Sequence, residues 1–269
     1  MFTTSATQLR NFTEVLKRSM RIFAAFIKRL MDIFFSVFSL LIFSLPLITV
    51  ICLIWSHDFK SPFYISTRIG KDGNSFKIIK LRSMVINADS KGIDSTSIND
   101  SRITPIGHFI RKYKLDEITQ LWNVLKGDMS LVGPRPNVKA ETDIYTTIER
   151  QLLSVKPGVT DFASIVFSDE GEILADKANP DIAYNQLIRP GKSALGLFYI
   201  RNKRIYLDII ILVLTILSIF SRSTALKVIA YVLKKLKAPS DLIATAKRDK
   251  KLFPKPPPGS DKIVKSRKL

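Results

Sequence analysis

The sequence predicts a helix-rich α+β fold that is monotopic in a membrane, with a re-entrant helix–break–helix, interfacial amphipathic helices and a small cytosolic domain. Three observations lead to this prediction. The chain of 269 residues carries a net charge of +19, although 46% of its residues are hydrophobic. Residues 33–56 form a run of 24 residues without a charge. Residues 57–200, in contrast, combine strand-like and helix-like patterns with polar loops.

The positive charge lies at the two ends of the chain. Residues 1–31 carry +5 and residues 222–269 carry +11, which leaves +3 for residues 32–221. Each basic end adjoins an apolar segment, as lipid binding requires, whereas nucleic-acid binding would need stacking aromatic residues among the basic ones. We therefore expect membrane lipids, and no nucleic acid, among the partners. One cysteine and two histidines exclude a disulfide framework, a thiolate metal cluster and a multi-histidine metal site.

The first segment, residues 1–31, has the pattern of a basic amphipathic helix lying on a membrane surface. Apolar residues recur at helical spacing, and basic residues occupy another side. A helix packed on the protein's own core is the alternative. The apolar positions are Leu9, Phe12, Leu16, Phe23, Phe26 and Leu30, and the basic positions are Arg10, Lys17, Arg21 and Lys28.

Residues 32–56 predict a membrane helix that enters, breaks and returns to the same face. The uncharged run exceeds the roughly 20 residues that cross a bilayer core. Its flanks are both basic, +5 before it and +4 over residues 57–82, so the positive-inside rule places both ends in the cytoplasm. Pro46, two residues after Ser44, removes a backbone donor and bends a helix. We predict the membrane break at Ser44 and Pro46, with a kinked span as the alternative.

Residues 57–208 predict a compact α/β domain. Residues 63–70 and 75–84 are typical of two strands joined by a tight turn, since Asp72-Gly73 favours positive φ angles. A polar loop follows over residues 91–102. Thr104 and Pro105 suit the cap and first position of a helix that continues through Arg111.

The next helix carries the most informative side chains. An apolar face ends at Gly127, which is placed to terminate the helix. Asp116, Gln120 and Asn123 form a polar face, and Glu117 lies beside it. Two adjacent carboxylates among cations suit phosphate chemistry, because a carboxylate can attack phosphorus while Arg, Lys and Mg²⁺ neutralise the anionic target. A solvated surface pair is the alternative. The apolar positions are Leu115, Ile118, Leu121, Trp122 and Leu125, and the nearby cations are Arg111, Lys112, Lys114 and Arg135.

The C-terminal part of the chain predicts further surface helices. Residues 209–220 are apolar but too short to span a bilayer, which indicates a core or interfacial helix. Residues 224–237 repeat the basic amphipathic pattern, so residues 209–238 form one group of apolar and amphipathic helices. The basic, proline-rich tail, residues 239–269, predicts disorder.

Ordered motifs in the middle of the chain closely resemble the bacterial sugar transferases, the polyprenyl-phosphate sugar-1-phosphate transferases of the small monotopic type. The resemblance covers about two thirds of the chain. It rests on residues 76–84 (FKIIKLRSM), 102–107 (RITPIG), 115–117 (LDE), 120–136 (QLWNVLKGDMSLVGPRP) and 156–160 (KPGVT).

The resemblance implies a phosphoglycosyl transferase at the cytoplasmic face of the bacterial inner membrane. Such an enzyme moves a sugar 1-phosphate from a UDP-sugar donor to undecaprenyl phosphate, with Mg²⁺ as cofactor, and releases UMP in the first membrane step of surface glycan synthesis. Asp116 matches the nucleophile that forms a covalent aspartyl-phosphosugar intermediate, and Glu117 matches the Mg²⁺ ligand. Lys80, Arg111 and Arg135 match cations that contact the phosphates or the donor. We also expect Arg82, Gln120, Asn123 and Asp181 among the substrate-binding residues, with helix packing as the alternative for Asp181.

Two other functions stay open on the sequence. A membrane-associated glycosyltransferase would move only the sugar and release UDP. A non-enzymatic basic membrane adaptor would turn over no UDP-sugar. The sugar, the glycan pathway (exopolysaccharide, O-antigen, lipopolysaccharide or capsule) and the oligomeric state, a homodimer included, are open as well. The acidic segment 168–173 lies where we expect sugar selectivity.

Overall fold

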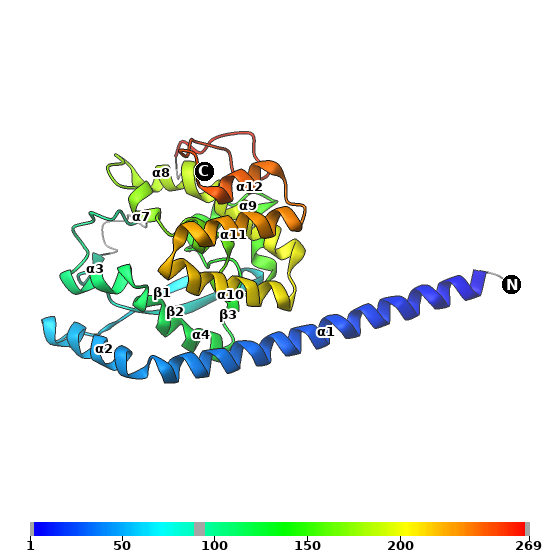
Figure 1. Ribbon diagram of the computed structural model, residues 1–269, viewed down its shortest axis with the longest axis horizontal. Coiled ribbons are helices and arrows are strands. Elements are labelled where there is room, and N and C mark those ends of the chain that lie inside the picture. The colour runs from blue at the N-terminus through cyan, green and yellow to red at the C-terminus, as the bar shows by residue number, and fades with distance from the viewer. Residues whose placement is uncertain (1–2, 89–94, 267–269) are drawn as a thin grey trace.

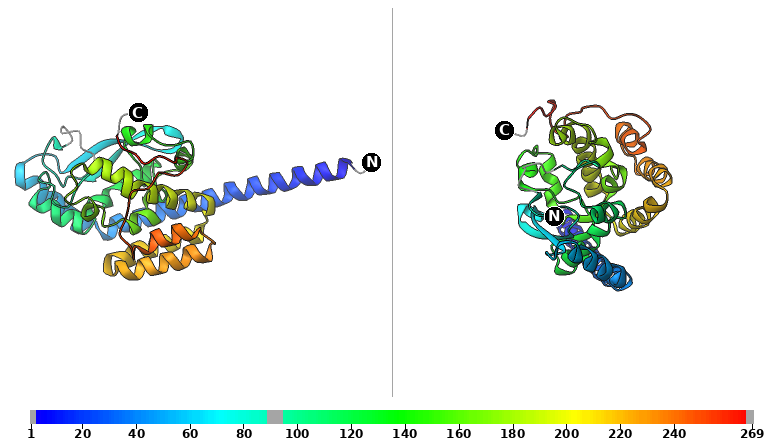
Figure 2. Two further views of the ribbon diagram at one scale, coloured as in Figure 1. Left: turned by 90° about the horizontal axis from the view of Figure 1, so that it is seen from above. Right: turned by 90° about the vertical axis from the view of Figure 1, so that its left-hand side faces the viewer.

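A helix of 40 residues, α1, opens the chain and extends past one side of the body that the later elements form (Figures 1 and 2). The computed structural model describes residues 3–88 and 95–266, without the side chains of residues 3–14, 16–18 and 21. The predicted helix-rich α+β class is confirmed. The first elements are α1 (Thr3–Ile42), α2 (Ser44–Asp58), β1 (Phe63–Ile69), η1 (Lys71–Gly73), β2 (Ser75–Leu81), α3 (Pro105–Lys112), η3 (Leu115–Gln120), α4 (Leu121–Lys126), β3 (Ser130–Val132) and α5 (Lys139–Asp143).

Helices dominate the second half of the chain. The remaining elements are η4 (Glu149–Ser154), β4 (Gly158–Thr160), α6 (Phe162–Val166), α7 (Glu170–Ile173), α8 (Pro180–Ala183), the π-helical η5 (Tyr184–Ile188), α9 (Arg189–Asn202), α10 (Ile205–Phe220), α11 (Arg222–Lys235) and α12 (Ser240–Lys247).

The chain bends sharply between α1 and α2. The segments Ile22–Ile42 and Ser44–Asp58 meet at 63°, and together they are long and apolar enough for a membrane segment. Among the described residues, no single helix is long and apolar enough to cross a membrane. Phe43 separates them, directly before Ser44 and three residues before Pro46. Pro46 has no N–H for the carbonyl of Ile42 and its ring would collide with that carbonyl in a straight helix, which explains the bend.

Polar residues of α1 dock this helix on the body. Lys28 Nζ lies 2.7 Å from Asp208 Oδ2 on α10, and the Arg29 guanidinium donates to the carbonyls of Val124 and Leu125 at 2.5 and 2.7 Å. Lys28 therefore contacts protein, which differs from its predicted lipid-facing position. The predicted apolar side of α1 is exposed where it is described, at Phe23, Phe26 and Leu30. The other predicted positions of this pattern, residues 9, 10, 12, 16, 17 and 21, lie outside the described side chains.

The strands form two small two-stranded sheets. β1 and β2 pair antiparallel, and positive φ angles at Asp72 (57°) and Gly73 (81°) close the predicted tight turn. β2 ends at Leu81, three residues before the predicted end. β3 and β4 pair in parallel. The predicted helix start at Thr104 is confirmed, because its side chain accepts a hydrogen bond from the N–H of Gly107 at 2.9 Å.

The later helices enclose the main apolar core. α10 buries Leu207, Ile211 and Leu214 and leaves Val213 and Ile216 exposed, so it packs on the core with one face and presents an apolar surface on the other. The composition of residues 239–269 predicts disorder, but α12 lies within this segment. Residues 248–266 form no helix or strand, yet they are bonded to the body. Gln186 accepts from the N–H of Lys255 at 3.0 Å and donates to the carbonyl of Val264 at 2.7 Å.

Candidate active site

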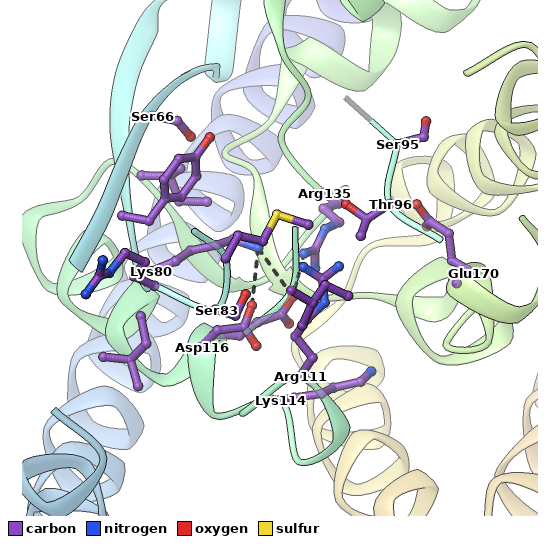
Figure 3. A pocket seen from close by; sticks show the side chains of 18 of the residues that line it. Ser66, Lys80, Ser83, Ser95, Thr96, Arg111, Lys114, Asp116, Arg135 and Glu170 are labelled. Carbon is purple, nitrogen blue, oxygen red and sulfur yellow. Dashed lines mark hydrogen bonds and ion pairs between the residues drawn. The ribbon is translucent and has the colours of Figure 1, made fainter. Parts of the chain in front are cut away.

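A cavity of about 1620 Å³ opens between the β1–β2 hairpin and the helices that follow it. Figure 3 shows charged side chains that reach into it from β2, α3 and η3. Seven of the nine residues predicted for catalysis or substrate binding line the cavity, together with Lys112 and Lys114, the other two cations singled out near the carboxylates. These seven are Lys80, Arg82, Arg111, Asp116, Glu117, Gln120 and Arg135.

The two adjacent carboxylates lie in the first turn of η3. Lys114, just before them, has a left-handed φ of 54°, which turns the chain between α3 and η3. Lys80 Nζ lies 3.8 Å from Asp116 Oδ2 and 3.7 Å from Glu117 Oε1. Arg135 forms an ion pair and a hydrogen bond with the same Glu117 oxygen. One lysine thus bridges both carboxylates, while the arginine binds only Glu117.

Because the two carboxyl groups share their cations unequally, their pKa values shift in opposite directions. Burial raises the pKa of Asp116, and the charge of Lys80 opposes that rise only in part. Burial would also raise the pKa of Glu117, but the charges of Arg135 and Lys80 outweigh it and hold this pKa well below its usual range. Two adjacent carboxyl groups thereby differ in basicity, which suits two different roles.

The cations of the site are partly desolvated. Burial lowers the pKa of Lys80, and the positive charge of Arg135 lowers it further. Burial likewise lowers the pKa of Lys114. A poorly hydrated ammonium group interacts more strongly with an anion that enters the cavity. The arrangement therefore favours a substrate that carries negative charge.

Side chains one turn apart attach the carboxylate-bearing segment to strand β2. Thr119 Oγ1 donates to the carbonyl of Ile79 at 3.0 Å, and Asn123 Oδ1 accepts from the N–H of Ile79 at 3.1 Å. Asn123 Nδ2 also donates to the carbonyl of Lys77 at 2.7 Å. Asn123 is fully buried and does not line the cavity. This differs from the prediction that it binds substrate, since both ends of its amide already hold the strand. The role of Thr119 was not predicted from the sequence. Its only signal there is that it is polar and lies four positions before Asn123, one helical turn away.

Other predicted residues lie in different surroundings. Gln120 is 1% exposed, and its Nε2 has no hydrogen-bond partner among the described residues. Arg82 lines the cavity, but its guanidinium forms a bidentate pair with Asp58 of α2 at 2.5 and 2.6 Å. Asp181 does not line the cavity; its Oδ1 accepts from the N–H of Ser95 at 2.9 Å. Asp181 thus supports a cavity-lining loop from behind.

The remaining wall of the cavity comes from two segments far apart in the chain. Residues 95–98 and 167–172 both line it, and the N–H of Ile98 donates to the carbonyl of Gly171 at 3.0 Å. Glu170 points into the cavity (Figure 3) and pairs with Lys192 of α9. The acidic segment singled out in the sequence is therefore part of the site.

Asp116 and Glu117 are two adjacent carboxylates of the cavity that a divalent cation could use. Within residues 3–88 and 95–266, no group of three or more His, Cys, Asp or Glu side chains could hold a metal ion. Mg²⁺, however, is often bound by one or two carboxylates together with water and substrate phosphates. Two adjacent carboxylates in a cation-rich cavity fit that mode.

A family model described as "Bacterial sugar transferase" matches residues 23–222. A putative undecaprenyl-phosphate N-acetylgalactosaminyl 1-phosphate transferase of Bacillus subtilis is 44% identical over 142 residues, which are 52% of this chain and 77% of the relative. A UDP-galactose-lipid carrier transferase of Erwinia amylovora is 34% identical over 217 residues, 74% of this chain and 42% of the relative. For a UDP-glucose:undecaprenyl-phosphate glucose-1-phosphate transferase of Escherichia coli, the identity is 34% over 204 residues, 74% of this chain and 41% of the relative. The chain thus spans less than half the length of the last two.

Proposed function

The chain belongs to the bacterial sugar transferase family, and from this we propose that it transfers a sugar 1-phosphate from a UDP-sugar to undecaprenyl phosphate. The products are undecaprenyl-diphosphate-sugar and UMP. The relatives' names describe transfers to undecaprenyl phosphate or a lipid carrier. The observation that carries the proposal is the pair Asp116–Glu117 beside Lys80 and Arg135 in one large cavity.

In the first step, a carboxylate oxygen of Asp116 attacks the phosphorus that bears the sugar. The bond from this phosphorus to the bridging oxygen breaks, and UMP leaves with the electron pair. A buried carboxylate with a raised pKa is poorly hydrated and more basic, and both properties favour nucleophilic attack. Lys80 lies within 4 Å of both carboxylates and stabilises negative charge that develops on the phosphoryl oxygens.

In the second step, a phosphate oxygen of undecaprenyl phosphate attacks the same phosphorus. The bond to Asp116 breaks, the carboxylate is restored, and the diphosphate-linked sugar leaves with the lipid. Arg135 and Lys80 serve again, because the phosphorus stays at the same place. One nucleophile thus serves a soluble donor and a lipid acceptor in turn.

Mg²⁺ is the cofactor in this proposal, with Glu117 as its protein ligand, and when bound it would neutralise charge on the donor diphosphate. The low pKa of Glu117 suits this role, because the carboxylate stays ionised at any pH at which the enzyme works. Arg135 now occupies one oxygen of Glu117. Its side chain keeps the carboxylate oriented toward the cavity.

The same proposal places the bend between α1 and α2 in the cytoplasmic leaflet as a re-entrant helix pair. Exposed apolar residues on both helices, such as Phe34, Phe38, Leu45 and Ile48, supply the lipid-facing surface. The active-site cavity then lies on the cytoplasmic side, where a UDP-sugar is available.

Nucleotide release distinguishes this function from its competitors. The protein is incubated with undecaprenyl phosphate, Mg²⁺ and, in turn, UDP-glucose, UDP-galactose and UDP-N-acetylgalactosamine, and the released nucleotide is identified. UMP supports the proposal, UDP indicates a glycosyltransferase, and no turnover with any UDP-sugar contradicts both enzyme functions.

A variant with Asp116→Asn tests the covalent step. It should lose at least about a thousandfold in kcat, and it should retain no sugar phosphate after denaturation when the donor is labelled in the sugar. The wild-type protein, given the donor without lipid, should retain the label. A labelled Asp116→Asn protein would contradict the assignment of the nucleophile.

A further inference from the structure

The segment beyond residue 222 is built into the same apolar core as the site. The family model ends at residue 222, so α11, α12 and the tail are additions to the matched region. Their buried residues share one cluster with Val166 and Phe167, which precede the acidic wall segment. These buried residues include Ala225, Leu226, Ile229, Leu233, Leu242 and Ala246.

Two arginines, one at the end of the matched region and one in the addition, hold a single carboxylate of the cavity wall. Arg222, at the start of α11, places Nη2 2.9 Å from Asp169 Oδ1 and donates through Nε to Ser168 Oγ at 2.9 Å. Arg248, directly after α12, donates through Nη2 to Asp169 Oδ2 at 2.7 Å. The Arg248 side chain is 10% exposed, and its guanidinium lies 5.3 Å from the ring centre of Phe167.

Asp169 is part of the cavity itself. Residues 167–172 all line the cavity, and this stretch holds three acidic residues, Asp169, Glu170 and Glu172. Unpaired acidic groups would repel the diphosphate of a sugar nucleotide. Arg222 and Arg248 neutralise Asp169, and Lys192 neutralises Glu170, so this wall can approach an anionic donor.

We propose that Arg248 is a positioning residue, which holds Asp169 and thereby fixes the wall segment 167–172 in the shape that receives the UDP-sugar donor. The inference rests on the proposed function and extends it to a part of the chain outside the family match. Arg248 itself does not line the cavity. Its effect on the substrate therefore passes through Asp169.

The test compares Arg248→Gln with Arg248→Lys and with Lys247→Gln as the matched control. Lys247 is the neighbouring, exposed cation at the end of the same helix. Arg248→Gln should raise the KM for the UDP-sugar about fivefold with kcat within about twofold of wild type. Arg248→Lys keeps the charge and should lie in between, and Lys247→Gln should match the wild type. A role in stability alone would reduce the active fraction, which lowers apparent kcat and leaves KM unchanged.

A double-mutant cycle with Asp169→Asn tests the route of the effect. If Arg248 acts through Asp169, the double variant should have about the KM of the worse single variant. An unchanged KM in Arg248→Gln, or KM effects that multiply in the double variant, would overturn the inference while wild-type release of UMP leaves the proposed function intact. A wild-type protein that releases no UMP would overturn both.

Discussion

The side chain of Asn123 forms a hydrogen bond with the backbone of Ile79 on the edge of β2 that faces away from β1, with Oδ1 3.1 Å from the Ile79 nitrogen. Lys80 is the next residue on that strand, and Asp116 and Glu117 lie about two turns before Asn123. The contact therefore fixes strand β2, which carries Lys80, to the helical segment that carries Asp116 and Glu117. It sets the separation of the three charged groups on which the proposed chemistry depends.

Removing this side chain should lower the stability of the fold. Asn123→Ala leaves the N–H of Ile79 and the carbonyl of Lys77 without their partner in a buried place, which we expect to lower the free energy of unfolding by about 2–4 kcal/mol. Urea denaturation in detergent measures the loss. Asn74→Ala, at an exposed turn, is the control and should change the stability by less than about 0.5 kcal/mol. Equal stabilities of the two variants would contradict the role assigned to Asn123.

The pH dependence of kcat/KM should be bell-shaped. Asp116 must be ionised, and burial raises its pKa above 3.8, so activity should be lost as the pH falls through a value above 3.8. Lys80 must be protonated, and burial lowers its pKa below 10.5, so activity should also be lost as the pH rises through a value below 10.5. Initial rates at low donor concentration, from pH 5 to 10, measure both limbs.

Substitution by arginine identifies the group behind the alkaline limb. Arginine stays protonated throughout this range, so Lys80→Arg should move the alkaline limb upward and leave the acid limb in place. Lys114 also lines the cavity and has a lowered pKa, which makes Lys114→Arg the matched comparison. A shift in Lys114→Arg and none in Lys80→Arg would assign the limb to Lys114 instead.

A re-entrant helix pair places both of its ends on one side of the membrane. In a Cys52→Ser background, single cysteines are introduced at Ser19 on α1 and at Ser61 after α2, both exposed positions. A membrane-impermeant maleimide should label both from the cytoplasmic face of inverted vesicles. Labelling of the two positions from opposite faces would show a kinked span.

Pro46 allows a second test of the same segment. Pro46→Ala restores a donor for the carbonyl of Ile42 and removes the ring that would collide with it. The pair α1–α2 should then straighten, and the cysteine introduced at Ser61 should no longer be labelled from the cytoplasmic face. Unchanged labelling would mean that other contacts, such as the pair of Asp58 with Arg82, hold α2 in place.

The Lys28–Asp208 pair should contribute measurably to the attachment of α1. Asp208 is 2% exposed and also accepts from the hydroxyl of Tyr199 at 2.6 Å. Lys28→Met leaves this buried carboxylate without its cation, so we expect a loss of about 2 kcal/mol in the free energy of unfolding. Urea denaturation checks it against Lys227→Met at an exposed position. A smaller loss in Lys28→Met combined with Asp208→Asn than in Lys28→Met alone would identify the unpaired charge as the cause.

Local patterns in the sequence predicted the parts of the fold that local physics decides. The Asp-Gly turn, the Thr104 cap and the αL glycine at Gly127 each need only neighbouring residues, and the structure has all three. Lys28 differs, because its partner lies 180 positions away. A basic residue that faces lipid and one that faces a buried aspartate look the same in a sequence.

The candidate site shows the same division. Lys80, Asp116 and Glu117 were singled out by motif and chemistry, and the structure brings them together. Asn123 and Asp181 were predicted to bind substrate, but each forms a hydrogen bond with a backbone group of a distant segment. The tail's attachment escaped prediction for a related reason, since its composition does not reveal the backbone carbonyl and the side-chain amide that it finds at Gln186.

Because α1 is attached to the body near its bend, this helix fixes the distance between the body and the bend. The side chain of Asp32 accepts from the N–H of Leu131 in β3, four residues before Arg135, and the helix ends at Ile42. At about 1.5 Å per residue, the ten steps from Asp32 to Ile42 measure roughly 15 Å. If the bend lies in the leaflet as proposed, the cavity stands at one constant height above the lipid. The second step can then use a lipid carrier whose phosphate stays in the plane of the headgroups.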